Sequence, residues 1–156
     1  MIKCLRVDHR LLHGQVAFSW TSHLDADCIL IANDSVMNDE IRKMSIKMAK
    51  PQGVKLVLKS VEDGIKAINS GVTDKYKLFI VVESIEDAYR FVKGTSVIKS
   101  VNLGGTKAKE GTKNISKAVN VLDSEIEMIK EMANDGVEVE IRMVPNDTKI
   151  LAKNVI

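Results

Sequence analysis

The sequence is poor in aromatic residues and in cysteine, and it contains no long apolar run. Aromatic side chains account for 4% of the 156 residues, too few for a surface that stacks the bases of single-stranded nucleic acid. The only cysteines, Cys4 and Cys28, lie in apolar stretches and lack the spacing of a disulfide framework or a CxxC metal site. We expect both thiols to be buried and reduced, as is usual in the cytosol.

The sequence also lacks a strong excess of charge of either sign, because it has 23 basic and 21 acidic residues and a net charge of +2. A chain so close to balance lacks the broad basic surface of a nucleic-acid-binding protein, so no nucleic-acid partner is expected. No apolar run approaches the roughly 20 residues that cross a bilayer, and the stretch Met1–Leu5 is too short for a signal peptide. We therefore expect a cytoplasmic protein that meets a membrane only through a partner.

Motifs for common cofactors are absent as well. There is no GxxxxGK[ST] loop and no GxGxxG fingerprint, which leaves nucleotide binding without support. No group of histidines, cysteines and carboxylates has the spacing of metal ligands. We expect neither a metal nor another cofactor.

What the sequence does contain is a regular alternation of apolar runs and helical patterns, at a spacing typical of βαβ units. Ala26–Ala32 and Lys77–Val82 are apolar almost throughout, as expected of parallel strands buried on both faces. We predict a single doubly wound α/β domain over residues 1–156, with a mainly parallel sheet and helices on both faces. The expected strands are Ile2–Val7, Ala26–Ala32, Val54–Leu58, Lys77–Val82, Val97–Leu103, Ile115–Val121 and Val137–Met143, and the expected helices are Gln15–Leu24, Asp39–Lys50, Ser60–Asn69, Ser84–Val92 and Asp123–Ala133.

Two of these helices carry further expectations. In Asp39–Lys50, the apolar positions include Met44 and Met48, which we assign to the core rather than to a ligand site. Ser60, three residues before Asp63, is expected to cap the helix that follows it.

Polar residues follow several of the expected strands: Asp8–Gly14, Asn33–Asp34, Glu83–Ser84 and Asn102–Thr106. In an open parallel sheet, ligands bind beyond the carboxyl ends of the strands, so these segments should share one edge of the molecule. The weaker candidates for a site at this edge are Asn33, Asp34, Ser84, Gly104 and Gly105. The basic run of Lys107, Lys109 and Lys113 is typical of solvated surface, with the docking of an acidic partner as the alternative.

The chemistry is concentrated in one stretch, Arg6-Val7-Asp8-His9-Arg10-Leu11-Leu12-His13-Gly14-Gln15-Val16. Imidazole is a nucleophile that is largely neutral at cellular pH, and guanidinium matches the oxygens of a phosphate. His13 is followed by Gly14 and a helix start, whose N–H groups favour an anion, and Arg10 lies three residues before it. The pattern favours a His13 that accepts a phosphoryl group; the alternative is a helix-start histidine whose ring is satisfied by the backbone.

Two other residues of the stretch, Arg6 and Asp8, have two interpretations each. Arg6 either binds phosphate or pairs with Asp8 at the strand end. Asp8 either fixes the tautomer of His13 and orients Arg10, or only forms an Asx turn. His9 is expected to be a solvated turn residue, and His23, in the last turn of its helix, a structural one.

This stretch resembles the signature loop of the EIIB component of the bacterial phosphoenolpyruvate-dependent sugar phosphotransferase system, mannose/fructose/sorbose class. The resemblance continues at Asn33-Asp34, Asn102-Leu103-Gly104-Gly105 and Val144-Pro145-Asn146-Asp147, and so spans the chain. His9 stands where relatives often carry another polar residue, commonly Asp.

The resemblance implies a phosphocarrier. His13 would receive the phosphoryl group from a phosphohistidine of EIIA and pass it to the sugar bound by the membrane permease EIIC/EIID. Arg10 would support transfer, and Arg6, Asp8, Gly14 and Gln15 match the rest of the loop. The protein would be cytoplasmic, peripherally associated with the permease, and compatible with a homodimer.

Two other functions stay open on the residues alone. A histidine phosphatase or mutase also uses a phosphohistidine, but typically with arginine directly before it, where this chain has Leu12. The second is a non-catalytic domain in which the arginine loop binds a phosphorylated metabolite.

Overall fold

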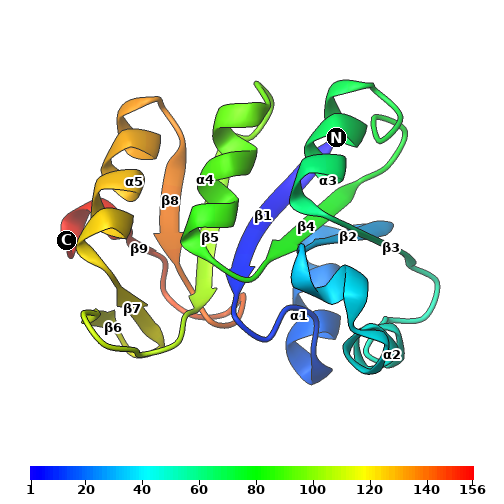
Figure 1. The fold of residues 1–156 in the computed structure, drawn as a ribbon, viewed down its shortest axis with the longest axis horizontal. Coiled ribbons are helices and arrows are strands. Elements are labelled where there is room, and N and C mark those ends of the chain that lie inside the picture. Colours follow the sequence, from blue (N-terminus) through cyan, green and yellow to red (C-terminus); the bar gives the residue numbers. More distant parts are fainter.

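The computed structural model describes residues 1–156 and alternates strands with helices along most of the chain (Figure 1). The strands are β1 (Ile2–Asp8), β2 (Cys28–Ala32), β3 (Lys55–Lys59), β4 (Leu78–Val82), β5 (Ser100–Gly105), β6 (Lys113–Ser116), β7 (Val119–Val121), β8 (Glu138–Ile141) and β9 (Ile150–Leu151). The helices are α1 (Gly14–Leu24), α2 (Glu40–Met48), α3 (Val61–Asn69), α4 (Ile85–Gly94) and α5 (Asp123–Asn134), with short 3-10 turns η1 (Ser35–Asn38) and η2 (Ala152–Asn154).

Seven of the strands form one sheet in the order β3-β2-β4-β1-β5-β8-β9. All neighbours pair in parallel except β8 and β9, which are antiparallel. From β1 the chain crosses to β2 on one side, whereas β4 connects across β1 to β5 on the other. The carboxyl end of β1 is therefore a topological switch point, where helices leave the sheet on opposite faces and a crevice is expected.

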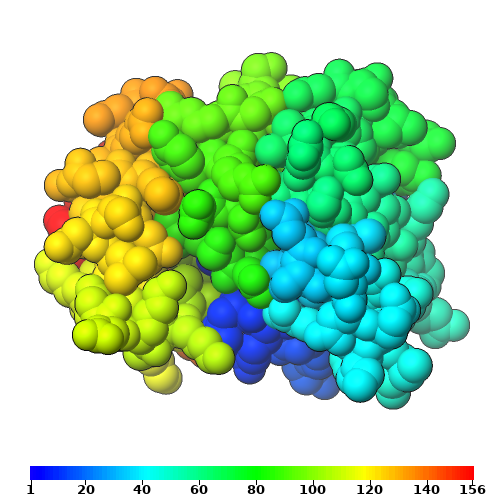
Figure 2. Space-filling view, viewed as in Figure 1, coloured from blue at the N-terminus to red at the C-terminus, as the bar shows by residue number.

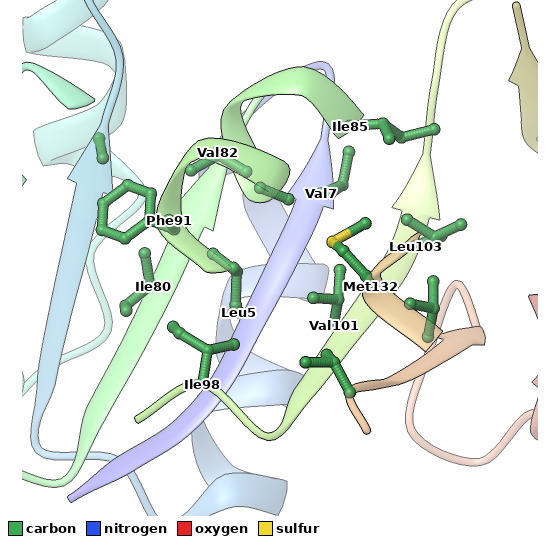
Figure 3. Close-up of a cluster of buried hydrophobic side chains, with 14 of the residues drawn as sticks. Leu5, Val7, Ile80, Val82, Ile85, Phe91, Ile98, Val101, Leu103 and Met132 are labelled. Atoms are coloured by element: carbon green, nitrogen blue, oxygen red, sulfur yellow. The ribbon is translucent and has the colours of Figure 1, made fainter. Parts of the chain in front are cut away.

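Two apolar clusters lie on the two faces of the sheet, as the predicted doubly wound class requires. The larger contains buried residues of α3, α4 and α5, which lie in a row across one face in Figure 1, and the smaller contains Trp20 of α1 and Ile46 of α2. Figure 3 shows Leu5 and Val7 of β1 in the larger cluster, beside Ile80 and Val101 of the neighbouring strands. Burial of each such side chain contributes roughly 1.5–3 kcal/mol to folding, so β1 is held firmly at the centre.

The predicted strand Ile115–Val121 is wrong in one respect. The segment is a hairpin of β6 and β7, which pair antiparallel in a separate two-stranded sheet. The chain turns at Lys117 and Ala118, so the apolar residues on either side belong to two short strands rather than one. This hairpin stands between β5 and α5, at the lower left in Figure 1.

The assignment of Met44 and Met48 to the core is also wrong. Their exposed fractions are 62% and 82%, and Ile41 is 81% exposed, whereas Ile46 is the buried residue of α2. Residues 41, 44 and 48 share one stripe of the helix, but that stripe faces outward. None of the helices is both long and apolar enough to cross a bilayer.

Other expectations are confirmed. The Ser60 side chain accepts a hydrogen bond from the backbone N–H of Asp63 and caps α3. Cys4 and Cys28 are free and buried. Burial raises the pKa of Cys4 to about 12, so this thiol stays protonated and is a poor nucleophile.

Candidate active site

The first half of the loop that joins β1 to α1 is fixed by backbone hydrogen bonds. The His9 N–H donates to the Gly105 carbonyl at 3.0 Å, and the Leu11 N–H donates to the Asp8 carbonyl at 2.8 Å. Leu11 has a φ of 59°, in the left-handed region that costs a non-glycine residue of order 1 kcal/mol, and its buried side chain holds it there. Gly14 has a φ of +37°, which suits the absence of a side chain.

Asp8 is the fully buried centre of this loop, with 0% exposure. One carboxylate oxygen lies 3.0 Å from His13 Nε2 and 3.1 Å from an Arg6 nitrogen, and the other accepts the Arg10 N–H at 3.0 Å. Burial alone would raise the pKa of Asp8, but the hydrogen bonds from His13 and Arg10 and the Arg6 charge outweigh it and hold the pKa below its usual range. Asp8 therefore stays ionised, and the contacts expected of both roles are present: an Asx turn to the Arg10 N–H and a hydrogen bond with the His13 ring.

The contact with Asp8 decides which nitrogen of His13 is available. An ionised carboxylate only accepts hydrogen bonds, so in the neutral ring Nε2 carries the proton and Nδ1 keeps its lone pair. The backbone of His13 is extended (φ −155°, ψ 142°) at the N-cap of α1, and its side chain is 24% exposed. Nδ1 forms no hydrogen bond within the protein and is not a buried atom, and it belongs to the residue before a helix start that no side chain caps.

Arg6 lies beneath the loop rather than on its surface, with an exposed fraction of 2%. Its guanidinium donates to Asp8 (3.1 Å), to the side-chain oxygen of Asn102 (2.7 Å) and to the carbonyls of Arg142 (3.2 Å) and Met143 (3.1 Å). Of the two interpretations, the structure shows the pair with Asp8. Burial lowers the pKa of Arg6, and the Asp8 charge opposes this shift.

Sequence reasoning did not single out Glu140 and Arg142, and it gave Asn102 only as part of a polar segment after a strand and of the family resemblance. Arg6, Asn102 and Glu140 are register neighbours across β1, β5 and β8, so they form one row on one face of the sheet. The Asn102 amide donates to Glu140 at 3.2 Å, and Glu140 pairs with Arg142 at 3.0 Å. The only sequence feature that pointed to Glu140 is the alternation of charged and apolar residues in β8. That pattern is equally typical of a strand whose charged face is exposed to solvent.

Trp20 of α1 completes this buried network. The guanidinium groups of Arg6 and Arg142 lie 5.1 and 5.2 Å from its ring centroid, and its N–H donates to the Met143 carbonyl at 2.9 Å. Cation–π contacts of this kind contribute roughly 0.5–2 kcal/mol each. His23 lies edge-on to Trp20, with ring centroids 5.8 Å apart. This packing contact fits the structural role expected of His23.

Gly104 allows the close approach of Arg6 to the sheet. A Cβ atom at this position would lie 2.1–2.4 Å from the Arg6 guanidinium, which is closer than any real contact. Gly105 has more room, since the nearest atom to its Cβ would be His9 Nδ1 at 3.7 Å.

Arg10 differs from Arg6 because its side chain is 54% exposed, with its Nε 3.7 Å from Asp8. It borders an open cavity of about 750 Å³ that Ser84 also lines. Figure 2 shows the start of the chain, in blue, set back between the segment around α2, in cyan, and the segment after β5, in yellow-green. The lining residues are His9, Arg10, Arg42, Glu83, Ser84, Ile85, Thr106, Lys107, Lys109 and Glu125.

The expected gathering of strand ends at one edge is therefore found for Asp8–Gly14, Glu83–Ser84 and the segment after Gly105. Asn33 and Asp34 contact other elements. The Asn33 side chain accepts from Ser35 and Val36 in η1, and Asp34 accepts the Val61 N–H and pairs with Arg90 at 3.3 Å. Gln15 is exposed in the first turn of α1.

His9 is not the solvated turn residue that was expected. Its ring is partly buried, and its Nδ1 is a buried atom without a hydrogen-bond partner. The ring lies against Gly105, whose lack of a side chain leaves space for it.

Comparison with known proteins finds relatives over nearly the whole chain. The family model described as the sorbose subfamily IIB component of the phosphotransferase system matches residues 2–156. The sorbose-specific EIIB component of Lacticaseibacillus casei is 34% identical over 155 residues, which cover 98% of this chain and 94% of the relative. The mannose-specific EIIAB component of Escherichia coli is 32% identical over 150 residues, which cover 96% of this chain and 46% of that longer protein.

A solved structure shows the same fold. The crystal structure of the IIB domain of the sorbose permease from Klebsiella pneumoniae superposes with a TM-score of 0.93 at 29% identity. The superposition covers 99% of this chain and 94% of that one.

Proposed function

Since the chain belongs to the sorbose subfamily of EIIB components of the bacterial sugar phosphotransferase system, we propose that His13 is the residue that carries its phosphoryl group. EIIB components are phosphotransferases that work with an EIIA donor and a sugar permease. The observation that supports His13 most strongly is its contact with Asp8, which leaves Nδ1 free at the surface.

The first half-reaction moves the phosphoryl group onto His13. Its Nδ1 lone pair attacks phosphorus in line, the new N–P bond forms, and the N–P bond to the histidine of EIIA breaks. Such transfers pass through a loose transition state, so positioning and charge stabilisation dominate over covalent assistance. Asp8 keeps the Nε2 proton in place and stabilises the positive charge that develops on the ring.

Charge on the transferred oxygens is met from two directions. Arg10 is exposed and has only a long contact with Asp8, so its fork can turn toward the phosphoryl group. The first N–H groups of α1 have no side-chain cap and favour an anion at His13. Arg6 and Asp8 support these groups from beneath, and Gly14 permits the sharp entry into the helix.

In the second half-reaction a sugar hydroxyl attacks the same phosphorus. The O–P bond forms, the N–P bond to His13 breaks, and the hydroxyl proton passes to the Nδ1 that the phosphoryl group leaves and from there to solvent. We propose that the membrane permease EIIC/EIID binds that sugar. We also propose that the protein associates with the membrane by binding this permease. That the protein forms a homodimer stays a prediction. Analytical ultracentrifugation of the purified protein would test it by measuring the oligomeric state.

Intact-mass analysis after incubation with phosphoenolpyruvate, the two general phosphotransferase proteins and an EIIA tests the proposal. We expect one acid-labile phosphate on the wild type and none on His13→Ala. His23→Ala is the matched control, because it removes a histidine from the same helix outside the loop, and it should label like the wild type. Labelling of His13→Ala would overturn the assignment.

The position of the phosphate on the ring is a separate measurement. Nitrogen chemical shifts of the phosphorylated protein distinguish the two isomers, and we expect phosphate on Nδ1. Phosphate on Nε2 would show that the contact with Asp8 breaks before transfer.

A further inference from the structure

The cavity beside Arg10 carries positive charge that the rest of the protein does not neutralise. Lys107 and Lys109 are exposed at its border, and neither forms an ion pair. Arg10 has only the 3.7 Å contact with Asp8, whose charge is already shared with Arg6 and His13. Such cations attract an anion, and a phosphate group matches them best.

His9 adds a directed donor to these charges. Its Nδ1 is buried against Gly105 without a partner, so a proton there would be left unsatisfied. The other ring nitrogen, Nε2, is neither buried nor hydrogen-bonded within the protein, so it is the nitrogen that is left to meet a ligand. The His9 N–H is fixed to the Gly105 carbonyl at 3.0 Å, which holds the residue at this border.

Three other lining residues suit hydroxyl groups. Glu83 uses one oxygen to bind Arg42 at 3.0 Å, and Glu125 uses one to accept the Leu122 N–H at 2.8 Å, so each keeps a free oxygen. The Ser84 oxygen accepts the Asp87 N–H at 3.1 Å, and its own proton remains available. Only one of the ten lining residues is hydrophobic, which disfavours an apolar ligand.

From this arrangement we propose that the cavity binds a sugar phosphate, or another small phosphorylated polyol. Its phosphate lies among Arg10, Lys107, Lys109 and His9, and its hydroxyls face Glu83, Ser84 and Glu125. The volume of about 750 Å³ is within the range of small-molecule sites, roughly 300–1,000 Å³. If His13 is the phosphocarrier proposed above, an occupant that engages Arg10 also slows transfer to His13.

Calorimetric titration with a hexose 6-phosphate, the same hexose and inorganic phosphate tests the site. We expect the sugar phosphate to bind at least tenfold more tightly than either fragment. The double variant Lys107→Gln/Lys109→Gln should weaken binding at least tenfold. The matched control, Lys113→Gln/Lys117→Gln, removes the same charge from the next part of the chain, outside the cavity, and should bind like the wild type.

Three results would overturn the proposal: no binding of the sugar phosphate, equal affinity for inorganic phosphate, or equal weakening by the two double variants. The variant His9→Phe, which keeps a ring but removes the Nε2 donor, should bind several-fold more weakly than the wild type. His13→Ala should bind the sugar phosphate normally. Binding is thereby measured independently of phosphotransfer, so a failure of the carrier role and a failure of this site give different results.

Discussion

Arg6, near the end of β1, and Arg10, in the loop that follows, lie in opposite environments, and their difference explains how the site is built. Arg6 is buried, and its guanidinium has four hydrogen-bond partners within the protein. Arg10 is half exposed and borders an open cavity with two lysines that have no acidic partner. A charge whose partners are all internal holds neighbouring atoms in place, whereas a charge without partners is available to bind an anion.

The buried side is energetically demanding. Desolvating an arginine and an aspartate costs several kcal/mol per ion, and the attraction between them offsets this only with good geometry and further hydrogen bonds. The row of Asn102 and Glu140 provides those bonds. An apolar core of the same size would serve stability as well, so we attribute the charged row to the positioning of Asp8 and His13.

Arg6→Met tests this side with the largest expected effect. The variant leaves Asp8 buried without its main counter-charge, and we expect the free energy of unfolding to fall by about 3–5 kcal/mol. Urea denaturation measures the change. Arg10→Met is the control, and because that side chain is exposed it should change stability by less than about 1 kcal/mol. Equal effects of the two substitutions would remove the contrast between the arginines.

Asp8→Asn isolates the charge at the centre of the loop. Charge-assisted hydrogen bonds contribute about 1.5–3 kcal/mol, and we expect a loss of that order at pH 7. The pKa of Asp8 is held below its usual range, so the wild type has this stability above about pH 4 and loses it as the pH falls further through the folded value. The variant does not titrate there, so denaturation at pH 7 and pH 3 should show a smaller difference for Asn than for Asp.

The same variant should also slow phosphorylation. An amide at this position does not fix the Nε2 proton of His13, so both tautomers of the ring become populated. The fraction of molecules in which Nδ1 has a free lone pair therefore falls. We expect a loss of at least about tenfold in the rate of labelling by EIIA, which quenched-flow measurement would detect. An unchanged rate would mean that Asp8 supports the fold alone.

The chemistry of this loop could be predicted because its groups fall within eleven consecutive residues, Arg6–Val16. The fold class could be predicted as well, since apolar runs and helical periods are local properties of a sequence. Asn102, Glu140 and Arg142 could not be placed under the loop, because their proximity to Arg6 depends on the strand order β1-β5-β8 and on its register. A pair of charges in an alternating strand fits a solvated face equally well.

Two of the errors have local causes, and a third, at His9, does not. The period of α2 identifies a stripe containing Met44 and Met48 but does not say which way the stripe faces. The turn between β6 and β7 is Lys117-Ala118, which lacks the glycine or asparagine that usually marks a two-residue hairpin. His9 was misplaced because its burial comes from contact with Gly105, a residue almost a hundred positions away.

The two glycines that end β5, Gly104 and Gly105, allow the fixed position of Arg6 to be tested by adding a single methyl group. Gly104→Ala would place a Cβ within 2.4 Å of the Arg6 guanidinium, which its internal partners hold in place. We expect a loss of about 1–3 kcal/mol in unfolding free energy and slower labelling of His13. Gly105→Ala is the matched control, because its nearest contact would be an ordinary 3.7 Å, and it should be tolerated. Equal behaviour of the two variants would show that Arg6 can move without consequence.

The smallest effect on stability is expected on the open side. Lys107 and Lys109 are exposed and form no ion pair, so replacing either by glutamine removes no internal contact. Each substitution should change the free energy of unfolding by no more than about 0.5 kcal/mol, and a slight gain is consistent with relief of repulsion from Arg10. Denaturation at low salt measures the change in unfolding free energy. Its repeat at high salt shows how much of that change comes from charge repulsion, because repulsion between exposed charges is screened by salt. A loss of about 2 kcal/mol or more, on the order of a broken buried contact, would mean that these lysines stabilise the fold much as Arg6 does, and the division between a structural and an available charge would fail.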